Sequence, residues 1–216
     1  FSLMFGAATE TTAGSLTKIH TWKPSPLTPL TPVTGTIEQG SSAGAEKFTF
    51  AVVKDLSIKW STENADIEGN LFAQQYQTNI TPTSSVAELA NKPANPAAVG
   101  VYISTDGSAF TLLADVMSGE FNMTGLWKPS FHQDPSHASF DRIVEQLPEF
   151  KMSVTVEDGT ECDNFMTYLR SGQAIWVGIQ VLGPLIEGST YHTIQVRMPV
   201  FVTQPDFGDK DSVFGS

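Results

Sequence analysis

Three side chains with metal-binding chemistry lie close together between residues 132 and 137. His132, Asp134 and His137 are ligand types that zinc accepts, but Pro135 interrupts the set and no distant fourth ligand accompanies it. Structural zinc sites usually combine two separated ligand pairs. A solvated loop is the favoured interpretation, and we predict no metal site.

Two further sets of acidic residues could bind calcium or act in catalysis, but their sequence context does not support either role. Asp206, Asp209 and Asp211 lack the twelve-residue spacing and the terminal Glu of a calcium loop. Glu157, Asp158 and Glu187 could supply the two carboxylates of a glycosidase, but nothing in the sequence places them across a cleft.

The sequence also lacks the motifs that normally accompany a catalytic nucleophile or a phosphate-binding loop. There is no G-x-S-x-G elbow, and the four histidines occur in no triad context. Cys162 is flanked by two acids that oppose thiolate formation, so it is interpreted as an apolar filler. "GSSAGA" lacks the Lys and Ser/Thr of a P-loop. We predict that the protein is not an enzyme and holds no cofactor.

Composition limits the class of protein further. At 216 residues and 40% hydrophobic content, the chain can bury one substantial core. Its 12 basic and 23 acidic residues give a net charge of −11, which opposes sustained binding to nucleic acid or anionic membranes. The longest apolar stretch, "AIWVGIQVLGPLI", falls short of the roughly 20 residues of a membrane span, so we expect a soluble chain.

The chain divides into three predicted parts. Residues 1–46 are rich in Thr, Ser, Gly and Pro and are predicted to form an extended N-terminal arm. Residues 47–203 alternate between apolar and polar residues over short runs, which is typical of strands. Residues 204–216 are predicted to be a surface tail. The expected fold is mainly β, an antiparallel sandwich or rolled barrel with one flanking short helix and extended terminal arms.

A two-faced ribbon is predicted over residues 52–73, with a turn at "TENAD". One face is apolar and is expected to pack on the core, whereas the other is largely polar. The apolar positions are Leu56, Ile58, Trp60, Ile67 and Leu71, with Gly69 between the last two.

Further elements follow the ribbon. "TDGSA" predicts a hairpin turn, Thr160 and Gly172 are expected to bound a short helix, and "GPLIEGS" is expected to separate two closing strands. Between residues 128 and 148, helix and irregular strand both remain open.

Three segments resemble the tail tube proteins of long, non-contractile-tailed bacteriophages: "FTFAVVKDLSIKWSTENADIEGNLFAQQYQTNIT", which contains the ribbon, "GVYISTDGSAFTLLADVMSGEFNMTGLW" and "EFKMSVTVEDGTECDNFMTYLRSGQAIWVGIQVLGPLIEGSTYHTIQVRMPVFV". The resemblance covers roughly residues 47–216, and its motifs are structural patterns rather than a catalytic fingerprint. Inner tubes of contractile tails, secretion-system tubes and tail terminators share this fold class.

The resemblance implies a virion tail protein, made in the bacterial host cytoplasm, that assembles as stacked hexameric rings around a channel for DNA. The implied partners are copies of itself, a tape measure protein in the lumen, and the tail terminator and distal tail proteins. DNA would pass without sticking, because a negative lumen repels phosphates. Glu63, Asp66 and Glu68 are the candidate lumen-facing acids.

A second function remains open, a carbohydrate- or protein-binding β-sandwich module of a surface or adhesion protein. It would present exposed aromatic side chains, for which Trp22, Trp127 and Tyr191 are the candidates. A tube protein should polymerise at high concentration, whereas a binding module should stay monomeric.

Overall fold

The structure is a computed structural model that describes residues 1–24, 27–41, 43–84, 86, 99–132, 139–157, 159–203 and 214–215. Strands make up 57% of it. In chain order the elements are α1 (Ser2–Phe5), β1 (Thr9–Thr12), β2 (Lys18–Thr21), β3 (Gly35–Ser41), β4 (Gly44–Trp60), β5 (Ala65–Phe72), β6 (Gln75–Thr78), β7 (Val99–Ser104), β8 (Thr111–Leu112), β9 (Val116–Thr124), β10 (Trp127–Ser130), β11 (Arg142–Glu145), β12 (Glu149–Val156), α2 (Thr160–Ser171), β13 (Ile175–Glu187), β14 (Thr190–Val200) and β15 (Phe214–Gly215).

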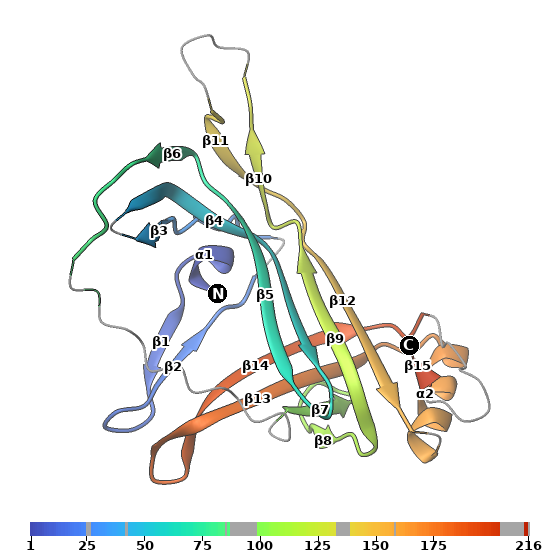
Figure 1. Cartoon of the computed structure of the whole chain (residues 1–216). Helices are drawn as coiled ribbons and strands as arrows, with labels where there is room; N and C mark the ends of the chain where they lie inside the picture. The colour runs from blue at the N-terminus through green and yellow to red at the C-terminus, as the bar shows by residue number, and fades with distance from the viewer. Residues whose placement is uncertain are drawn as a thin grey trace. The chain divides into compact units, whose positions relative to one another are not determined.

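The predicted fold class is confirmed. The sheets are antiparallel and two short helices accompany them, as in a β-sandwich with a minor helical part. The largest sheet has the strand order β15-β12-β9-β4-β3, with β5 and β6 also paired to β4, and a four-stranded sheet has the order β14-β13-β7-β8 (Figure 1). No sheet in the described residues closes into a barrel, so of the two architectures expected, the open one is found.

Two compact units divide the chain, and each is built from separate stretches of sequence. The first comprises Phe1–Ser57, Glu68–Ala90 and Asn122–Phe150. The second comprises Ile58–Ile67, Asn91–Phe121 and Lys151–Ser216. The boundaries proposed from composition, at residues 46 and 203, do not coincide with this division.

The described part of the N-terminal segment contains a short helix and strands. Helix α1 buries Met4 and Phe5 in the first unit, and the Met4 carbonyl accepts a 2.6 Å hydrogen bond from the buried indole of Trp127. Strands β1 and β2 form a hairpin, whereas residues 29–34 lie outside helices and strands. Composition indicated the Pro-rich stretch but not the burial of two apolar side chains near the start.

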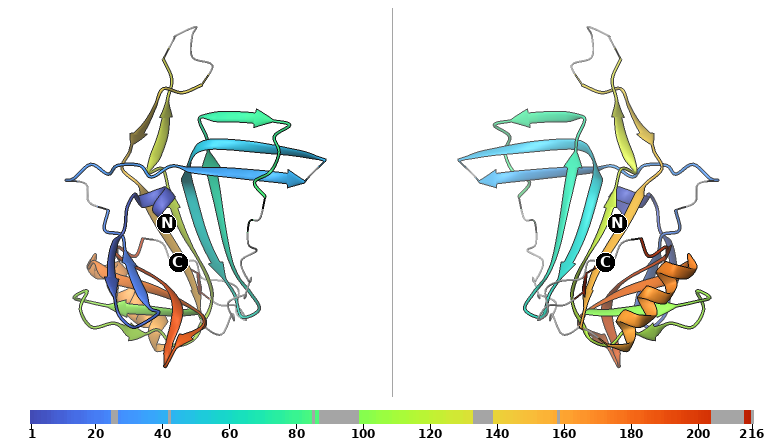
Figure 2. Two further views of the ribbon diagram at one scale, coloured as in Figure 1. Left: turned by 90° about the vertical axis from the view of Figure 1, so that its left-hand side faces the viewer. Right: turned by 90° about the vertical axis from the view of Figure 1, so that its right-hand side faces the viewer.

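Strand β4 changes the direction of its side chains in the middle. Phe50 has a positive φ of 55° and is 47% exposed, and the next two residues, Ala51 and Val52, are both buried. Consecutive burial breaks the period-two alternation of a strand, as an inserted bulge residue does. Beyond the irregularity, Ile58 and Trp60 are buried as predicted. In Figure 2 the first half of β4 runs between β3 and β6, with which it pairs.

The second strand of the predicted ribbon does not bury its apolar residues. Ile67 is 50% exposed and Leu71 is 48% exposed, and only the ends of β5 are partly covered. The expected apolar face of the ribbon therefore holds for β4 and not for β5. Alternation in the sequence specifies that two faces differ, but the neighbouring elements determine whether either face is covered.

The region from 128 to 148, for which helix and strand were both open, forms a hairpin. Strands β10 and β11 pair from Trp127 opposite Glu145 to Ser130 opposite Arg142. The apolar residues whose spacing suggested a helix lie in and next to strand β11; they are Phe140, Ile143, Val144 and Leu147. The helix alternative is wrong because cross-strand pairing dominates over the local pattern.

Helix α2 and the closing hairpin are close to prediction. Gly159 is the N-cap in place of Thr160, which is the first helical residue, and Gly172 ends the helix in the left-handed conformation at φ 61°. The buried Cys162 lies on this helix, as an apolar filler would. Strand β13 continues with register shifts through "GPLIE", so the turn lies only at Gly188 and Ser189. Of the two described helices, neither is long and apolar enough to cross a membrane.

In the second unit, Trp60 lies across Gly119. A Cβ placed on Gly119 would collide with the Trp60 indole and would lie 2.7 Å from the Ser153 carbonyl oxygen. Trp60 is only 6% exposed, and its indole nitrogen is buried without a hydrogen-bond partner among the described atoms. The packing of this ring therefore depends on the missing side chain at position 119.

We expect Gly119→Ala to lower the free energy of unfolding by about 2 kcal/mol, because an added carbon in a close-packed site forces side chains or backbone to shift. Urea denaturation measures the loss. Gly44→Ala is the matched control, since nothing lies within 4 Å of a Cβ at that strand position. Adding Trp60→Phe should recover part of the loss; an equal loss in the single and double variants would contradict the steric explanation.

Candidate functional site

The three candidate lumen acids are all exposed. Glu63 lies in the turn between β4 and β5, which closes through a hydrogen bond from Ser61 N to Asn64 O at 2.8 Å. Asp66 and Glu68 are two residues apart in β5 and therefore extend from the same face of that strand. The Asn64 amide donates to Asp66 at 2.8 Å. Two of the acids thus share a face, and whether they line a channel remains a prediction.

The residues considered for catalysis or metal binding do not assemble into a site in the described part of the chain. Of the histidine set, His132 contacts Asp141 (Nδ1 to Oδ2, 2.5 Å), whereas Asp134 and His137 lie outside the described residues. No group of three or more metal-binding side chains occurs among the residues described. Asp158 and the three acids of the C-terminal tail, Asp206, Asp209 and Asp211, also lie outside the residues that the structure describes.

The aromatic residues considered for glycan binding are mostly committed to other contacts. Trp127 is 1% exposed and bonds to Met4, so its ring cannot stack on a sugar. Trp22 packs against Phe1, with ring centroids 5.6 Å apart, and donates its indole hydrogen to the Gly6 carbonyl. Tyr191 is 46% exposed. These three residues do not form the exposed aromatic set that the second function required.

The hydrogen-bonding pattern of the four-stranded sheet shows which residues of β14 direct their backbone N–H and C=O groups away from the sheet. In antiparallel strands each residue directs its N–H and C=O to one side, and the next residue directs them to the other. Leu113 N donates to Val101 O at 2.8 Å, so Val101 points its backbone groups away from β13. Ile179, the partner of Val101, must then bond to Val196 of β14.

The other set of β14 residues therefore directs its backbone outward. Thr193, Gln195 and Arg197 belong to this set, because they alternate with Val196. Pro199 belongs to it as well, and proline is tolerated at such a position because it has no N–H to donate. Strand β14 is the end strand of its sheet, and no described strand pairs with its outer side. An 11-residue edge of this kind is a template for another strand.

Large apolar side chains are exposed on strands and loops of both units. Phe131, Leu147 and Phe201 are 70%, 81% and 65% exposed. Single exposed apolar residues are ordinary on a monomer, whereas those that lie together can mark a surface that becomes covered on association. Others exposed by at least one third are Leu16, Ile19, Leu27, Val33, Phe50, Ile67, Leu71, Tyr76, Val86, Leu112, Met117, Val144, Phe150, Trp176, Leu185 and Tyr191.

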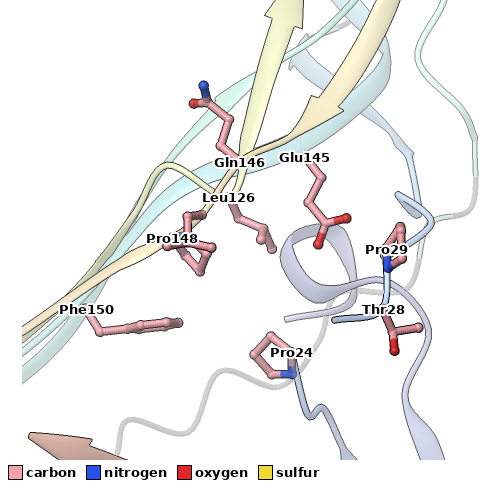
Figure 3. Close-up of a pocket in the computed structure, with 9 residues that line it drawn as sticks. Pro24, Thr28, Pro29, Leu126, Glu145, Gln146, Pro148 and Phe150 are labelled. Carbon is pink, nitrogen blue, oxygen red and sulfur yellow. The ribbon is translucent and has the colours of Figure 1, made fainter. Parts of the chain in front are cut away.

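A pocket of about 400 Å³ lies in the first unit. Figure 3 shows Glu145 extending from the end of β11 toward Thr28 and Pro29, with Pro148 and Phe150 along one side. The lining is mostly apolar and contains one carboxylate, so it offers no pair of groups for acid–base chemistry. The residues that line it are Pro24, Thr28, Pro29, Leu126, Glu145, Gln146, Leu147, Pro148 and Phe150.

The carboxylate of this pocket holds the N-terminal segment in place. Glu145 Oε2 accepts a 2.7 Å hydrogen bond from the Leu30 backbone, 115 positions away in the chain. Gln146 N donates to the Leu126 carbonyl at 2.8 Å, which anchors the same strand end. Sequence reasoning missed Glu145, since no local pattern connects it to Leu30.

We expect Glu145→Ala to lower the free energy of unfolding by about 1–2 kcal/mol, because the Leu30 amide loses its acceptor. Glu145→Gln should cost less, since its amide oxygen can still accept. Urea unfolding and hydrogen exchange at Leu30 measure the two effects. Glu63→Ala, at an exposed turn position, is the control; exchange at Leu30 that is unaffected by Glu145→Ala would contradict the anchoring role.

Comparisons with known proteins do not assign a function to this structure. No protein family matches the chain, and no curated protein matches it either. The functional argument therefore rests on the residues and contacts described above.

Proposed function

We propose that this protein is the subunit of a phage tail tube, assembling into stacked hexameric rings around a channel for the genome. The observation that carries the proposal is the outer edge of β14, whose backbone groups at Thr193, Gln195 and Arg197 point away from their own sheet. A ring gives such an edge a partner, because a head-to-tail contact that closes leaves no edge unpaired.

The exposed apolar residues support assembly in the same way. Phe201 follows directly after β14, and Leu185 and Tyr191 lie in the β13–β14 hairpin; all three are about half exposed or more. In a monomer these side chains contact water, whereas between copies they would be buried at about 25 cal/mol per Å² of apolar surface. A binding module that acts as a monomer would have less need of this surface.

The charge of the chain supports the channel. A net charge of −11 opposes adhesion of phosphate backbones to the wall of a tube. The acids Glu63, Asp66 and Glu68 are proposed to face the lumen, because they are exposed on the polar end of the β4–β5 ribbon. Their carboxylates would contact water and passing DNA rather than a neighbouring copy.

The proposal includes a location and a set of partners. The protein would reside in the virion tail after synthesis in the host cytoplasm. The tape measure protein would occupy the lumen before DNA does, and the tail terminator and distal tail proteins would bind the two ends of the tube. These assignments depend on the resemblance of residues 47–216 to tail tube proteins.

Negative-stain electron microscopy of the purified, concentrated protein tests the proposal directly. We expect hollow filaments or six-fold rings with a central hole. A monodisperse monomer that persists at high concentration would rule the proposal out. Glycan binding by such a monomer would favour the binding module.

Substitution of Gln195 tests the role of the β14 edge. Gln195→Pro removes an outward N–H and should leave the pairing with β13 intact, so we expect a folded protein that no longer forms rings or filaments. Gln195→Ala, which keeps the N–H, is the matched control and should assemble. Circular dichroism checks folding and microscopy scores assembly. Normal assembly by the proline variant would exclude this edge as the subunit contact.

Neutralising the candidate lumen acids tests the channel. The variant Glu63→Gln, Asp66→Asn and Glu68→Gln should retain more duplex DNA per assembled tube at low salt, because the repulsion that keeps phosphates off the wall is weakened. Cosedimentation of short linear DNA with assembled tubes measures retention.

A second triple variant gives the control for overall charge. Glu10→Gln, Glu120→Gln and Glu157→Gln neutralise three exposed or partly exposed acids at other places in the chain. Equal DNA retention by the two triple variants would mean that the three ribbon acids do not face the lumen.

A further inference from the structure

The second unit contains a pocket that the proposed function does not use. It has a volume of about 390 Å³, which falls within the range of small-molecule sites in proteins. One side is formed by the segment from Ile103 to Thr111, and the other by α2 and the start of β13. All of these residues belong to the second unit and all are described by the structure.

The lining combines neutral hydrogen-bonding groups with a small apolar floor. Asn164 and Tyr168 are one helical turn apart and therefore share a face of α2. Thr105 and Thr111, which carry hydroxyl groups, line the pocket from the opposite side. Ile175, which is 1% exposed, lies at the apolar base. The residues that line the pocket thus include an amide, hydroxyls and a phenol beside aliphatic carbon.

The loop that carries the pocket is held rigid by Asp106. Its Oδ1 accepts hydrogen bonds from Ser104 Oγ and Ser108 N, both at 2.8 Å, and its Oδ2 accepts one from Ser108 Oγ at 2.6 Å. These hydrogen bonds, led by that from the Ser108 hydroxyl, hold the pKa of the Asp106 carboxyl below its usual range. The loop is therefore preorganised, and a ligand need not order it on binding.

The lining argues against two common classes of ligand. Asp106 is the only carboxylate that lines the pocket, and its oxygens already accept several protein hydrogen bonds, whereas calcium prefers six to eight oxygen ligands with several carboxylates. No Lys or Arg lines the pocket, so a phosphate or carboxylate would find no counter-charge. A neutral molecule with many hydroxyl groups matches the groups present.

We propose that this pocket binds one neutral saccharide unit, through hydrogen bonds to Tyr168, Asn164 and the two threonines and contact of its C–H face with the apolar base. A pyranose presents hydroxyls around its rim and apolar carbon on its faces, which is the same combination that the lining presents. The site is separate from Trp22, Trp127 and Tyr191, and it does not depend on whether the protein forms tubes.

Saturation-transfer difference NMR on the full-length protein tests the site, because the method works for monomers and large assemblies alike. The probes are the methyl glycosides of glucose, galactose, mannose and N-acetylglucosamine. We expect transfer to the ring protons of at least one probe. Absence of transfer from all four would overturn the proposal.

Isosteric variants place the binding in this pocket. Tyr168→Phe and Thr111→Val each remove one hydroxyl and keep the side-chain shape, so each should weaken binding of the responsive glycoside about fivefold. Tyr191→Phe removes a hydroxyl from an exposed position in β14 and should leave binding unchanged. Equal affinity in all three variants would overturn the assignment to this pocket. Calorimetry tests calcium binding as the alternative. If Tyr168→Phe and Thr111→Val weakened calcium binding but not glycoside binding, the proposal would also be overturned.

Discussion

The alternation of backbone hydrogen bonds along β13 is the constraint on which the rest of the second unit depends. Its residues bond in turn to β14 and to β7, and the hydrogen bond from Leu113 N to Val101 O shows which residues of β13 bond to which neighbour. This pattern determines which residues of β14 direct their N–H and C=O groups away from the sheet. Pro199 is compatible with this pattern and would remove a ladder hydrogen bond in the opposite one.

In the first unit, hydrogen bonds between residues far apart in the chain hold the structure together. The Trp127 indole binds the carbonyl of Met4, and Glu145 binds the amide of Leu30. Both acceptor–donor pairs tie the N-terminal segment to the hairpin of β10 and β11. Met4 and Leu30, which belong to no strand, are thereby held by side chains of another hairpin.

The two pockets differ in what their polar groups do. Glu145 in the first unit is a structural acceptor surrounded by prolines and aliphatic side chains. In the second unit the structural acceptor, Asp106, is bonded within its own loop, and neutral groups of α2 and β8 complete the lining. The second pocket has more neutral hydrogen-bonding residues in its lining, which is the reason for proposing a ligand there and not in the first.

The fold class could be predicted from the sequence, because period-two alternation and turn residues specify strands locally. So could the end of α2 at Gly172 and the burial of Ile58 and Trp60. The exposure of β5, the packing of the N-terminal segment and the lining of the pockets could not be predicted in this way. Those features depend on contacts such as Glu145 to Leu30 and Trp60 to Gly119, whose partners are distant in the chain and leave no periodic signal in either segment.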